Sequence, residues 1–263
     1  MTEMSRPIPP EQEGSPFHEP LEEGGFSYKI KKLKSNPNKL VREHQLKPIN
    51  VDVIDPEEFK NALEHHRRGK RLFETLRERY GLHVPAMDLV VGSYESRQPT
   101  MFTVVDRIEG RSLAKLSKEL SPGDKEDLGK KLDEFYTGLL LHYRDVCKEG
   151  GDYWTDFFNG QLVYGRRHGE DADEVYIVDV DPHFNTHRKD SEETGLKPFE
   201  MFSECWGAIH QAEEYFGIRM EKARHTLESA LDEIPENEQL DWIVSYIKSQ
   251  LNFAPPDDSA GYY

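Results

Sequence analysis

The sequence predicts an α+β protein of two lobes, the first rich in strands and the second rich in helices. Two observations carry this prediction. Short runs of β-branched and aromatic residues gather before residue 106, around a single helical pattern. Amphipathic helical patterns dominate after that point, interrupted by one hairpin. We expect the first lobe to span residues 25–109 and the second to span 110–253.

Length and charge narrow the classes of protein that fit. The chain has 263 residues, which suffices for one large domain or two small lobes. Its formal net charge of −16 argues against a general nucleic-acid or anionic-membrane surface, so we expect neither partner. Cys147 and Cys205 form no disulfide framework and no metal-ligand spacing, as expected for reduced thiols in a cytoplasmic protein.

Both ends of the sequence have the composition of tails. Residues 1–24 are rich in proline, glutamate and glycine, and we expect them to be disordered. This polar start does not resemble a signal peptide, and no apolar run approaches the 18 residues of a membrane span. Residues 254–263 are predicted to be a flexible tail, with docking through the terminal tyrosines as the alternative.

The first lobe begins with strands and continues into a helix. Apolar residues alternate from Phe26 to Ile30, which predicts a half-buried strand. The turn at 35–38 leads into a second strand around Leu40. Asp55 as N-cap and Pro56 in the first helical position predict a helix that continues to Tyr80, where Gly81 stops it. Two further strands are predicted at 87–91 and 101–105.

The second lobe is built mainly from helices. Residues 106–116 are predicted to be a linker that leads into a short helix. Ser121 and Pro122 start the longest helical pattern, over 125–148, which Gly150 and Gly151 end. From Pro198 onward the sequence is again helical, in three runs that end near 217, 234 and 251.

The stretch from Tyr153 to Pro182 organises the rest of the chain. It is predicted to form a loop, a strand, a charged turn and a second strand over 175–178. The loop carries Asp156, Gln161 follows five residues later, and the second strand ends at Asp179 and Asp181. An acid before the first strand of a hairpin and acids after its second strand lie at the same open end, so they can converge. Their oxygen atoms suit a hard cation such as Mg²⁺.

This arrangement resembles the protein-kinase-like superfamily, in particular its aminoglycoside- and choline-phosphotransferase branch. The resemblance implies a two-lobed kinase-like α+β fold that uses ATP and Mg²⁺. It makes Asp156 the catalytic base and puts Gln161, or alternatively Asn159, in place of the metal-binding asparagine. Asp179 matches the metal-binding aspartate, and Asp181 stands where the family has glycine, so either acid is a candidate metal ligand.

For nucleotide binding, the resemblance implies a basic residue on a strand that contacts the phosphates. It also implies a glutamate on a helix that pairs with this basic residue. Arg42 matches the basic position, with Lys47 as the second choice. Glu64 is the first choice for the glutamate and Glu74 the second. The glycine-rich phosphate loop of the family is missing, because the turn KLKSNPNK contains no glycine.

The segment VVDRIEGRSL resembles the connector between the two lobes of a kinase. By that match Val104 and Val105 flank the adenine, and Asp106 to Glu109, Arg107 among them, offer backbone hydrogen bonds. An ordinary loop between a strand and a helix is the alternative interpretation.

Each candidate also has a structural interpretation that remains open. In this interpretation Asp156 caps a turn, and Asp179 and Asp181 are solvated charges at a strand end. Charged residues on helix faces are usually surface charges, which applies to Glu64 and Glu74. The histidine pairs His65–His66 and His183/His187 are interpreted as solvated side chains.

Three functions fit these patterns. The first is a phosphotransferase that uses ATP and Mg²⁺ and acts on a hydroxyl of an unknown small molecule or protein. The second is a pseudokinase that keeps the fold as a binding or regulatory module, favoured by the missing glycine loop and by Gln161. The third is a glycosyltransferase or phosphatase-like hydrolase built on Asp179-x-Asp181. The third ranks last for two reasons. A phosphatase motif belongs on a first strand, whereas these acids come late and are followed by Pro-His-Phe. A glycosyltransferase needs a preceding parallel sheet, and no alternating strand–helix series precedes these acids.

Overall fold

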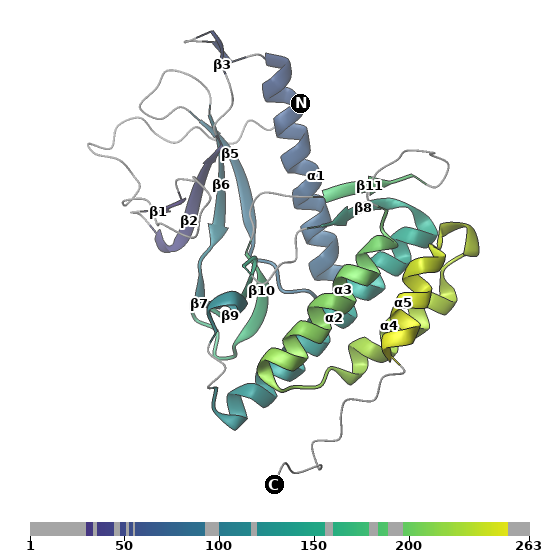
Figure 1. Ribbon diagram of the computed structural model, residues 1–263. Coiled ribbons are helices and arrows are strands. Elements are labelled where there is room, and N and C mark those ends of the chain that lie inside the picture. The colour runs from purple at the N-terminus through teal and green to yellow at the C-terminus, as the bar shows by residue number, and fades with distance from the viewer. Residues whose placement is uncertain are drawn as a thin grey trace. The chain divides into compact units, whose positions relative to one another are not determined.

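The computed structural model has an α+β architecture, which confirms the predicted fold class (Figure 1). The chain divides into two compact units. The first contains the chain up to Thr75, His83–Lys115 and Asn159–His183; the second contains Leu76–Leu82, Leu116–Phe158 and the chain from Phe184. The hairpin therefore groups with the first unit, whereas the predicted lobes place it in the second. The structure describes residues 30–33, 36–44, 48–50, 53–54, 56–92, 100–116, 120–155, 160–178, 184–188 and 197–251.

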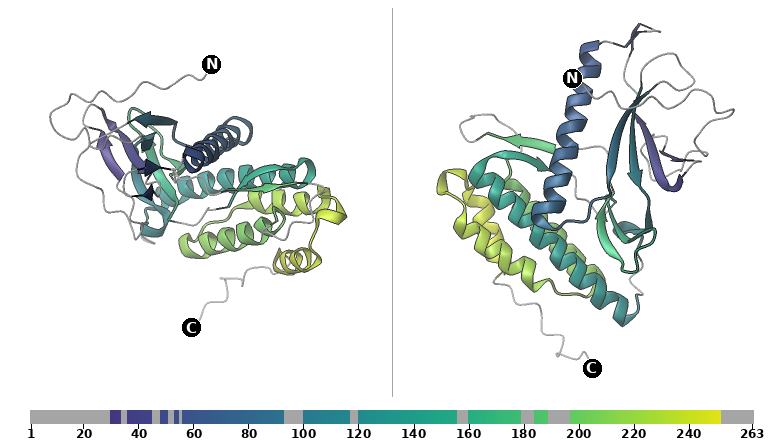
Figure 2. Two further views of the ribbon diagram at one scale, coloured as in Figure 1. Left: turned by 90° about the horizontal axis from the view of Figure 1, so that it is seen from above. Right: turned by 180° about the vertical axis from the view of Figure 1, so that it is seen from behind.

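The first unit contains an antiparallel four-stranded sheet whose strand order is β1-β2-β6-β5. Figure 2 shows the strands from two further sides. Val105 lies on the central strand β6 of this sheet, opposite Leu40 on β2 and Met87 on β5. Its side chain is only 5% exposed. Strands β5 and β6 confirm the two strands predicted at 87–91 and 101–105. The strands are β1 (Ile30–Leu33), β2 (Asn36–His44), β5 (Met87–Gly92) and β6 (Thr100–Asp106).

In the sequence, helix α1 (Pro56–Tyr80) lies between strands β1 and β2 and strands β5 and β6 of this sheet. It begins at Pro56, as predicted, because proline suits the first helical position. It ends before Gly81, whose φ of 69° lies in the left-handed region that favours glycine. Two short paired strands that the sequence did not predict precede it, β3 (Pro48–Asn50) and β4 (Val53–Ile54).

A second, three-stranded sheet corrects the prediction for residues 106–116. The predicted linker is strand β7 (Ile108–Ser112), followed by the 3-10 helix η1 (Leu113–Lys115). In this sheet β7 pairs with β9, and β9 with β10. Gly110 lies directly opposite Gly165, and a β-carbon on Gly165 would stand 2.3 Å from the carbonyl oxygen of Glu109. Two facing glycines therefore let the backbones of β7 and β9 approach closely.

Replacing Gly165 with alanine is expected to lower the free energy of unfolding by about 2 kcal/mol, as overpacking does. The new methyl group would meet the backbone of β7, which cannot move aside as a flexible side chain can. Urea denaturation measures the effect. Gly160→Ala is the matched control, because no described atom lies within 4 Å of a β-carbon there. Equal stability of the two variants would contradict the close approach.

The second unit is organised around helix α2 (Pro122–Glu149). The hydroxyl of Ser121 accepts a hydrogen bond from the amide of Asp124 at 3.2 Å, which confirms the predicted helix start. Helices α3, α4 and α5 follow where the sequence predicted helices, and Figure 1 shows α3 running along α2. Their bounds are α3 (Glu200–Phe216), α4 (Glu221–Glu233) and α5 (Asp241–Leu251), with the 3-10 helix η2 (Glu236–Glu238) before α5.

A two-stranded ribbon in this unit corrects two predictions. Tyr153 and Trp154 belong to strand β8 (Gly151–Trp154), not to a loop, and both are buried. Its partner is β11 (Phe184–His187). His187 is not a solvated histidine, because its side chain is 12% exposed and its Nε2 atom lies 3.2 Å from the carboxylate of Glu238. The ribbon is thereby joined to η2.

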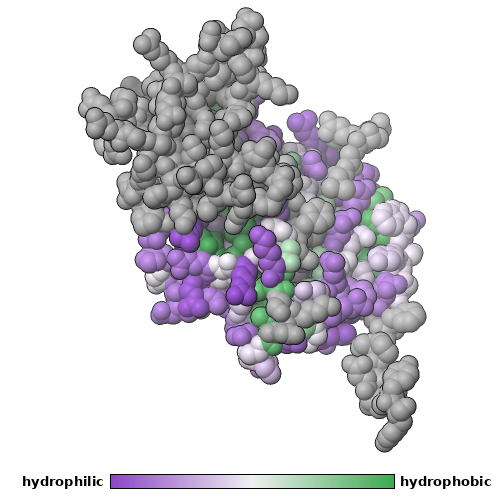
Figure 3. All heavy atoms as spheres, turned by 60° about the vertical axis from the view of Figure 1, so that its left-hand side comes forward, coloured by the Kyte–Doolittle hydropathy of each residue, from purple (hydrophilic) through white to green (hydrophobic). Residues whose placement is uncertain are grey.

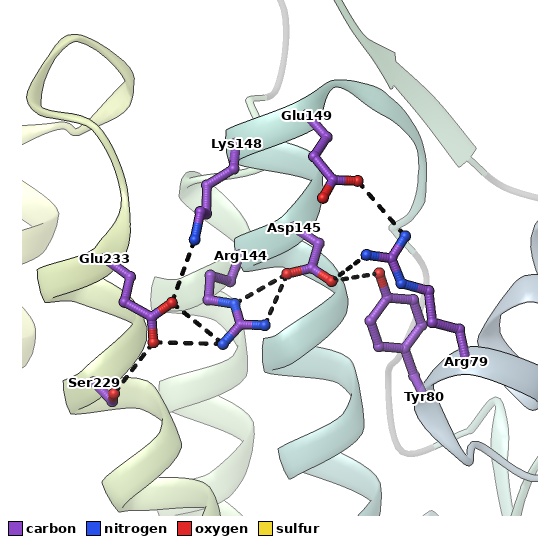
Figure 4. Close-up of polar contacts among 8 residues, drawn as sticks. All are labelled: Arg79, Tyr80, Arg144, Asp145, Lys148, Glu149, Ser229 and Glu233. Carbon is purple, nitrogen blue, oxygen red and sulfur yellow. Dashed lines mark hydrogen bonds and ion pairs between the residues drawn. The ribbon is translucent and has the colours of Figure 1, made fainter.

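Ion pairs centred on Asp145 link three helices within the second unit (Figure 4). Its carboxylate accepts hydrogen bonds from Arg79 at 2.9 Å, Tyr80 at 3.0 Å and Arg144 at 2.8 Å. Arg144 also reaches Glu233 on α4 at 3.4 Å. Burial alone raises the pKa of Asp145, but these hydrogen bonds and nearby cations hold the pKa below its ordinary value.

One face of the described residues is predominantly polar. Figure 3 shows hydrophilic side chains over most of the coloured part of that face, with small apolar spots between them. None of the described helices combines the length and the apolar character that crossing a membrane requires.

Candidate functional site

The site predicted from the sequence is built on the hairpin of β9 (Leu162–Arg167) and β10 (Glu174–Ile177). Leu162 lies opposite Ile177, and both are fully buried. One step further, the amide of Val178 donates a hydrogen bond to the carbonyl oxygen of Gln161 at 3.0 Å. The open end of the hairpin thus holds Gln161 opposite the residue that precedes Asp179 in the sequence.

The segment after α1 fixes this end of the hairpin. The amide of Ile177 donates to the carbonyl oxygen of His83 at 2.9 Å. The rings of His83 and Tyr176 pack edge to face with their centroids 5.5 Å apart. The imidazole Nε2 of His83 also lies 3.4 Å from the carboxylate of Glu174. Sequence reasoning missed this role of His83, which no local pattern marks.

Polar contacts among three side chains stabilise the turn end of the hairpin. The guanidinium of Arg167 lies 2.5 Å from the carboxylate of Glu170, which also accepts a hydrogen bond from the hydroxyl of Tyr176 at 2.7 Å. The bond from Tyr176, followed by that from Arg167, lowers the pKa of Glu170. Burial raises the pKa of Tyr176 to about 12, so its hydroxyl remains a donor at neutral pH.

The junction between β6 and β7 joins the two sheets of the first unit. The carboxylate of Asp106 contacts the ammonium of Lys39 on β2 and lies 3.7 Å from Arg167 on β9. The amide of Asp106 donates to the carbonyl oxygen of Ala86 at 3.1 Å, and the amide of Arg107 donates to Asn38 at 2.8 Å. Two backbone N–H groups of the segment that was predicted to offer hydrogen bonds to adenine therefore already have partners inside the protein.

The other described candidates lie on separate elements. Arg42 lies on β2, where its backbone pairs with Thr103 of β6. Glu64 lies on α1 with its carboxylate 55% exposed and 3.0 Å from the guanidinium of Arg71. Glu74 lies on the same helix, 4.0 Å from the ammonium of Lys70.

Five candidates lie outside the described residues, namely Lys47, Asp156, Asn159, Asp179 and Asp181. Their roles remain predictions. Within the described part of the chain, no group of three or more His, Cys, Asp or Glu side chains is arranged to hold a metal ion. Among the predicted metal ligands, the structure therefore describes only Gln161, which is half-buried at the hairpin end.

The sequence matches no protein-family model and no curated protein. Among solved structures, 43 chains match. One is WaaP in complex with acyl carrier protein, at 8% identity and a TM-score of 0.48, covering 89% of this chain and 88% of that one. Another is WbdD, at 12% identity and a TM-score of 0.40, covering 91% of this chain and 51% of that one, so this chain spans about half of it.

A third similar structure is a MAP kinase from Leishmania major, at 13% identity and a TM-score of 0.43. That match covers 92% of this chain and 72% of the kinase. Because all three TM-scores are below 0.5, we draw no conclusion about chemistry from these similarities.

Proposed function

We propose that this protein is a kinase-like phosphotransferase that uses ATP and Mg²⁺ and acts on a hydroxyl group of a small molecule or a protein. The observation that carries the proposal is the hydrogen bond between the amide of Val178 and the carbonyl oxygen of Gln161. It supports a close approach, along the chain, of Gln161 and of Asp179, the residue after Val178, at the open end of the hairpin. Oxygen ligands of this kind fit Mg²⁺.

Each predicted residue has a role in this proposal. Asp156 accepts the proton of the acceptor hydroxyl. The hydroxyl oxygen then bonds to the γ-phosphorus of ATP, while the bond between that phosphorus and the leaving oxygen of ADP breaks. Gln161 and Asp179 hold the metal, with Asp181 as the alternative acid. When bound, Mg²⁺ neutralises charge on the phosphate oxygens.

The nucleotide is assigned to the first unit. Arg42, or alternatively Lys47, binds the phosphates, and Glu64 orients that cation. Val105 and Arg107 line the adenine site at the end of β6. The burial of Val105 supports an apolar contact there.

A second candidate is a catalytically impaired pseudokinase that binds or regulates a partner. Two observations favour it. The amides of Asp106 and Arg107 are already bonded within the protein, and Glu64 pairs with Arg71 on its own helix. The absence of glycine from the first turn of the sequence points the same way.

Exchanging Asp156 for asparagine separates these candidates. For an active phosphotransferase, we expect Asp156→Asn to keep ATP binding and to lower phosphoryl transfer at least 100-fold, since a general base contributes about 10²–10⁴-fold. Release of labelled phosphate from ATP, with and without candidate hydroxyl acceptors, measures transfer. Asp173→Asn is the control, because Asp173 pairs with Arg166 in the hairpin turn. Nucleotide binding without transfer in the wild type would identify the pseudokinase.

A further inference from the structure

The ribbon of β8 and β11 contacts the 3-10 helix η2 through a pair of ionisable side chains, and all three elements belong to the second unit. The imidazole Nε2 of His187 lies 3.2 Å from a carboxylate oxygen of Glu238, and the two side chains are only 12% and 11% exposed. Water weakens ion pairs at a protein surface, whereas this pair is largely shielded from it. We call these two side chains the ribbon–η2 pair.

The ribbon fixes the position of the imidazole. His187 pairs with Gly151 on β8, and residues directly opposite each other in a ribbon share a face. Because Gly151 has no side chain, it leaves the space beside it to the imidazole. Two residues further along β8, Tyr153 lies on the same face and is buried. On the other face, the hydroxyl of Thr186 donates an exposed hydrogen bond to Asp152 at 2.7 Å. His187 therefore lies on the more buried face of the ribbon.

Contacts around η2 orient the carboxylate of Glu238. The side-chain amide of Asn237 donates to its Oε1 atom at 3.4 Å, while its Oε2 atom belongs to the ribbon–η2 pair. The carboxamide of Gln239 donates to the carbonyl oxygens of Ile234 at 2.6 Å and Leu231 at 3.2 Å. These bonds join η2 to the end of α4, so the carboxylate is held beside the ribbon.

The contact within the pair depends on charge. The two side chains are close enough for an ion pair, but the Nε2 atom of His187 has no hydrogen-bond partner among the described residues. Without a hydrogen bond, the attraction comes mainly from a positive imidazolium beside a negative carboxylate. A neutral imidazole would leave the largely buried carboxylate of Glu238 without a counter-charge, which destabilises a folded protein.

The other ionisable groups near the pair keep one charge state around neutral pH. Burial, followed by the charge of Glu238, raises the pKa of the Cys147 thiol on α2 to about 12. Burial, followed by the charge of Glu200 on α3, raises the pKa of the Tyr153 hydroxyl on β8. Arg188, the residue after β11, is exposed and stays positive. A change of charge between about pH 5.5 and 8.5 therefore arises at the imidazole.

We propose that the ribbon–η2 pair is a pH-sensitive switch, which holds β11 against η2 while His187 is protonated and releases β11 once the imidazole is neutral. Histidine ordinarily titrates at about pH 6.5 and glutamate at about pH 4.3, so both charges coexist between these values. The contribution of the pair to stability is therefore present at pH 5.5 and is lost as the pH rises toward 8.5. This inference is independent of the proposed phosphotransferase activity, because no residue of the candidate site takes part.

A double-mutant cycle with His187→Gln and Glu238→Gln tests the pair at pH 5.5 and at pH 8.5. Urea denaturation gives the unfolding equilibrium constants of the wild type, the two single variants and the double variant. Effects of other titrating groups are shared by these four proteins and cancel. We expect the two side chains to be coupled by about fivefold or more at pH 5.5 and by less than about twofold at pH 8.5.

His210 and Glu214 on α3 provide the matched control. They form a second histidine–glutamate pair at 3.7 Å in the same unit, but their side chains are 47% and 72% exposed. In a cycle of His210→Gln and Glu214→Gln we expect a coupling below about twofold at both pH values, because exposed pairs contribute little.

Hydrogen exchange of the β11 amides locates the effect. After correction for the intrinsic exchange rate at each pH, the protection of Phe184–His187 in the wild type should fall by about fivefold or more from pH 5.5 to pH 8.5. In His187→Gln this protection should be low at both pH values and change by less than about twofold.

Two results would overturn the proposal. One is a coupling between His187 and Glu238 that is the same at both pH values. The other is protection of β11 that falls equally in the wild type and in His187→Gln. Should the His187 variant fail to fold, Glu238→Gln alone decides. It should lower stability at pH 5.5 and not at pH 8.5, and an equal loss at both pH values would contradict the switch.

Discussion

Replacing Glu213 with alanine is expected to lower the free energy of unfolding by about 3–5 kcal/mol, the effect of breaking a buried ion pair. The carboxylate is 7% exposed and accepts hydrogen bonds from Arg224 at 2.9 Å and from the amide of Met220 at 2.8 Å. Its loss would leave the guanidinium, which is 12% exposed and stacked 4.7 Å from the ring centroid of Trp206, without a counter-charge.

Urea denaturation at neutral pH measures this loss. Glu214→Ala is the control at the neighbouring position, because its side chain is 72% exposed and its only described ion pair is a contact of 3.7 Å with His210. We expect that control to change stability by less than about 0.5 kcal/mol. A cost below about 1 kcal/mol for Glu213→Ala would show that the ion pair is not formed as described.

Stability is expected to fall between about pH 6.5 and pH 4 because of His142 on α2. This side chain is 2% exposed, and neither ring nitrogen hydrogen-bonds with the described residues. Burial lowers its pKa to about 4, while the charges of Asp145 and Arg79 act in opposite directions. The unfolded chain, with a histidine pKa of about 6.5, therefore binds the proton more tightly than the folded chain.

The sign of the effect follows from that difference. Stability from neutral His142 is complete above about pH 6.5 and is lost as the pH falls toward 4, by up to about 3 kcal/mol. Urea denaturation at steps of pH from 4 to 7 measures the slope. His142→Phe should reduce the slope over this range, whereas His65→Phe, at an exposed position of α1, should not. A slope that persists unchanged in His142→Phe would exclude His142 as its source.

Local signals predicted the long elements of the fold. Pro56 and Gly81 mark the ends of α1, and Ser121 marks the start of α2, because capping and backbone conformation depend on neighbouring residues. Strand β7 was missed because its sequence, IEGRS, has no apolar alternation. Its pairing depends on Gly110 meeting Gly165, which is far away in the sequence.

The candidate site was predictable only where its residues are close in sequence. The hairpin was predictable because β-branched and aromatic residues mark its second strand. The register that sets Gln161 opposite Val178 depends on the turn between the strands and was not predicted. The contacts of Asp106 with Lys39 and Arg167 join three strands and have no local signature. Likewise, the caps that Asp133 gives to the amides of Lys222 and Ala223 at the start of α4 come from another helix.

The most direct test of the proposed function is thermal unfolding with and without ATP and Mg²⁺. A ligand at 100 times its Kd stabilises the folded protein by about 2.7 kcal/mol, and we expect a stabilisation of this size that requires both components. Asp179→Asn should abolish the part that depends on Mg²⁺, while Asp181→Asn should retain it. The reverse outcome for the two variants would move the metal to Asp181. No stabilisation of the wild type at millimolar ATP and Mg²⁺ would contradict the proposed function.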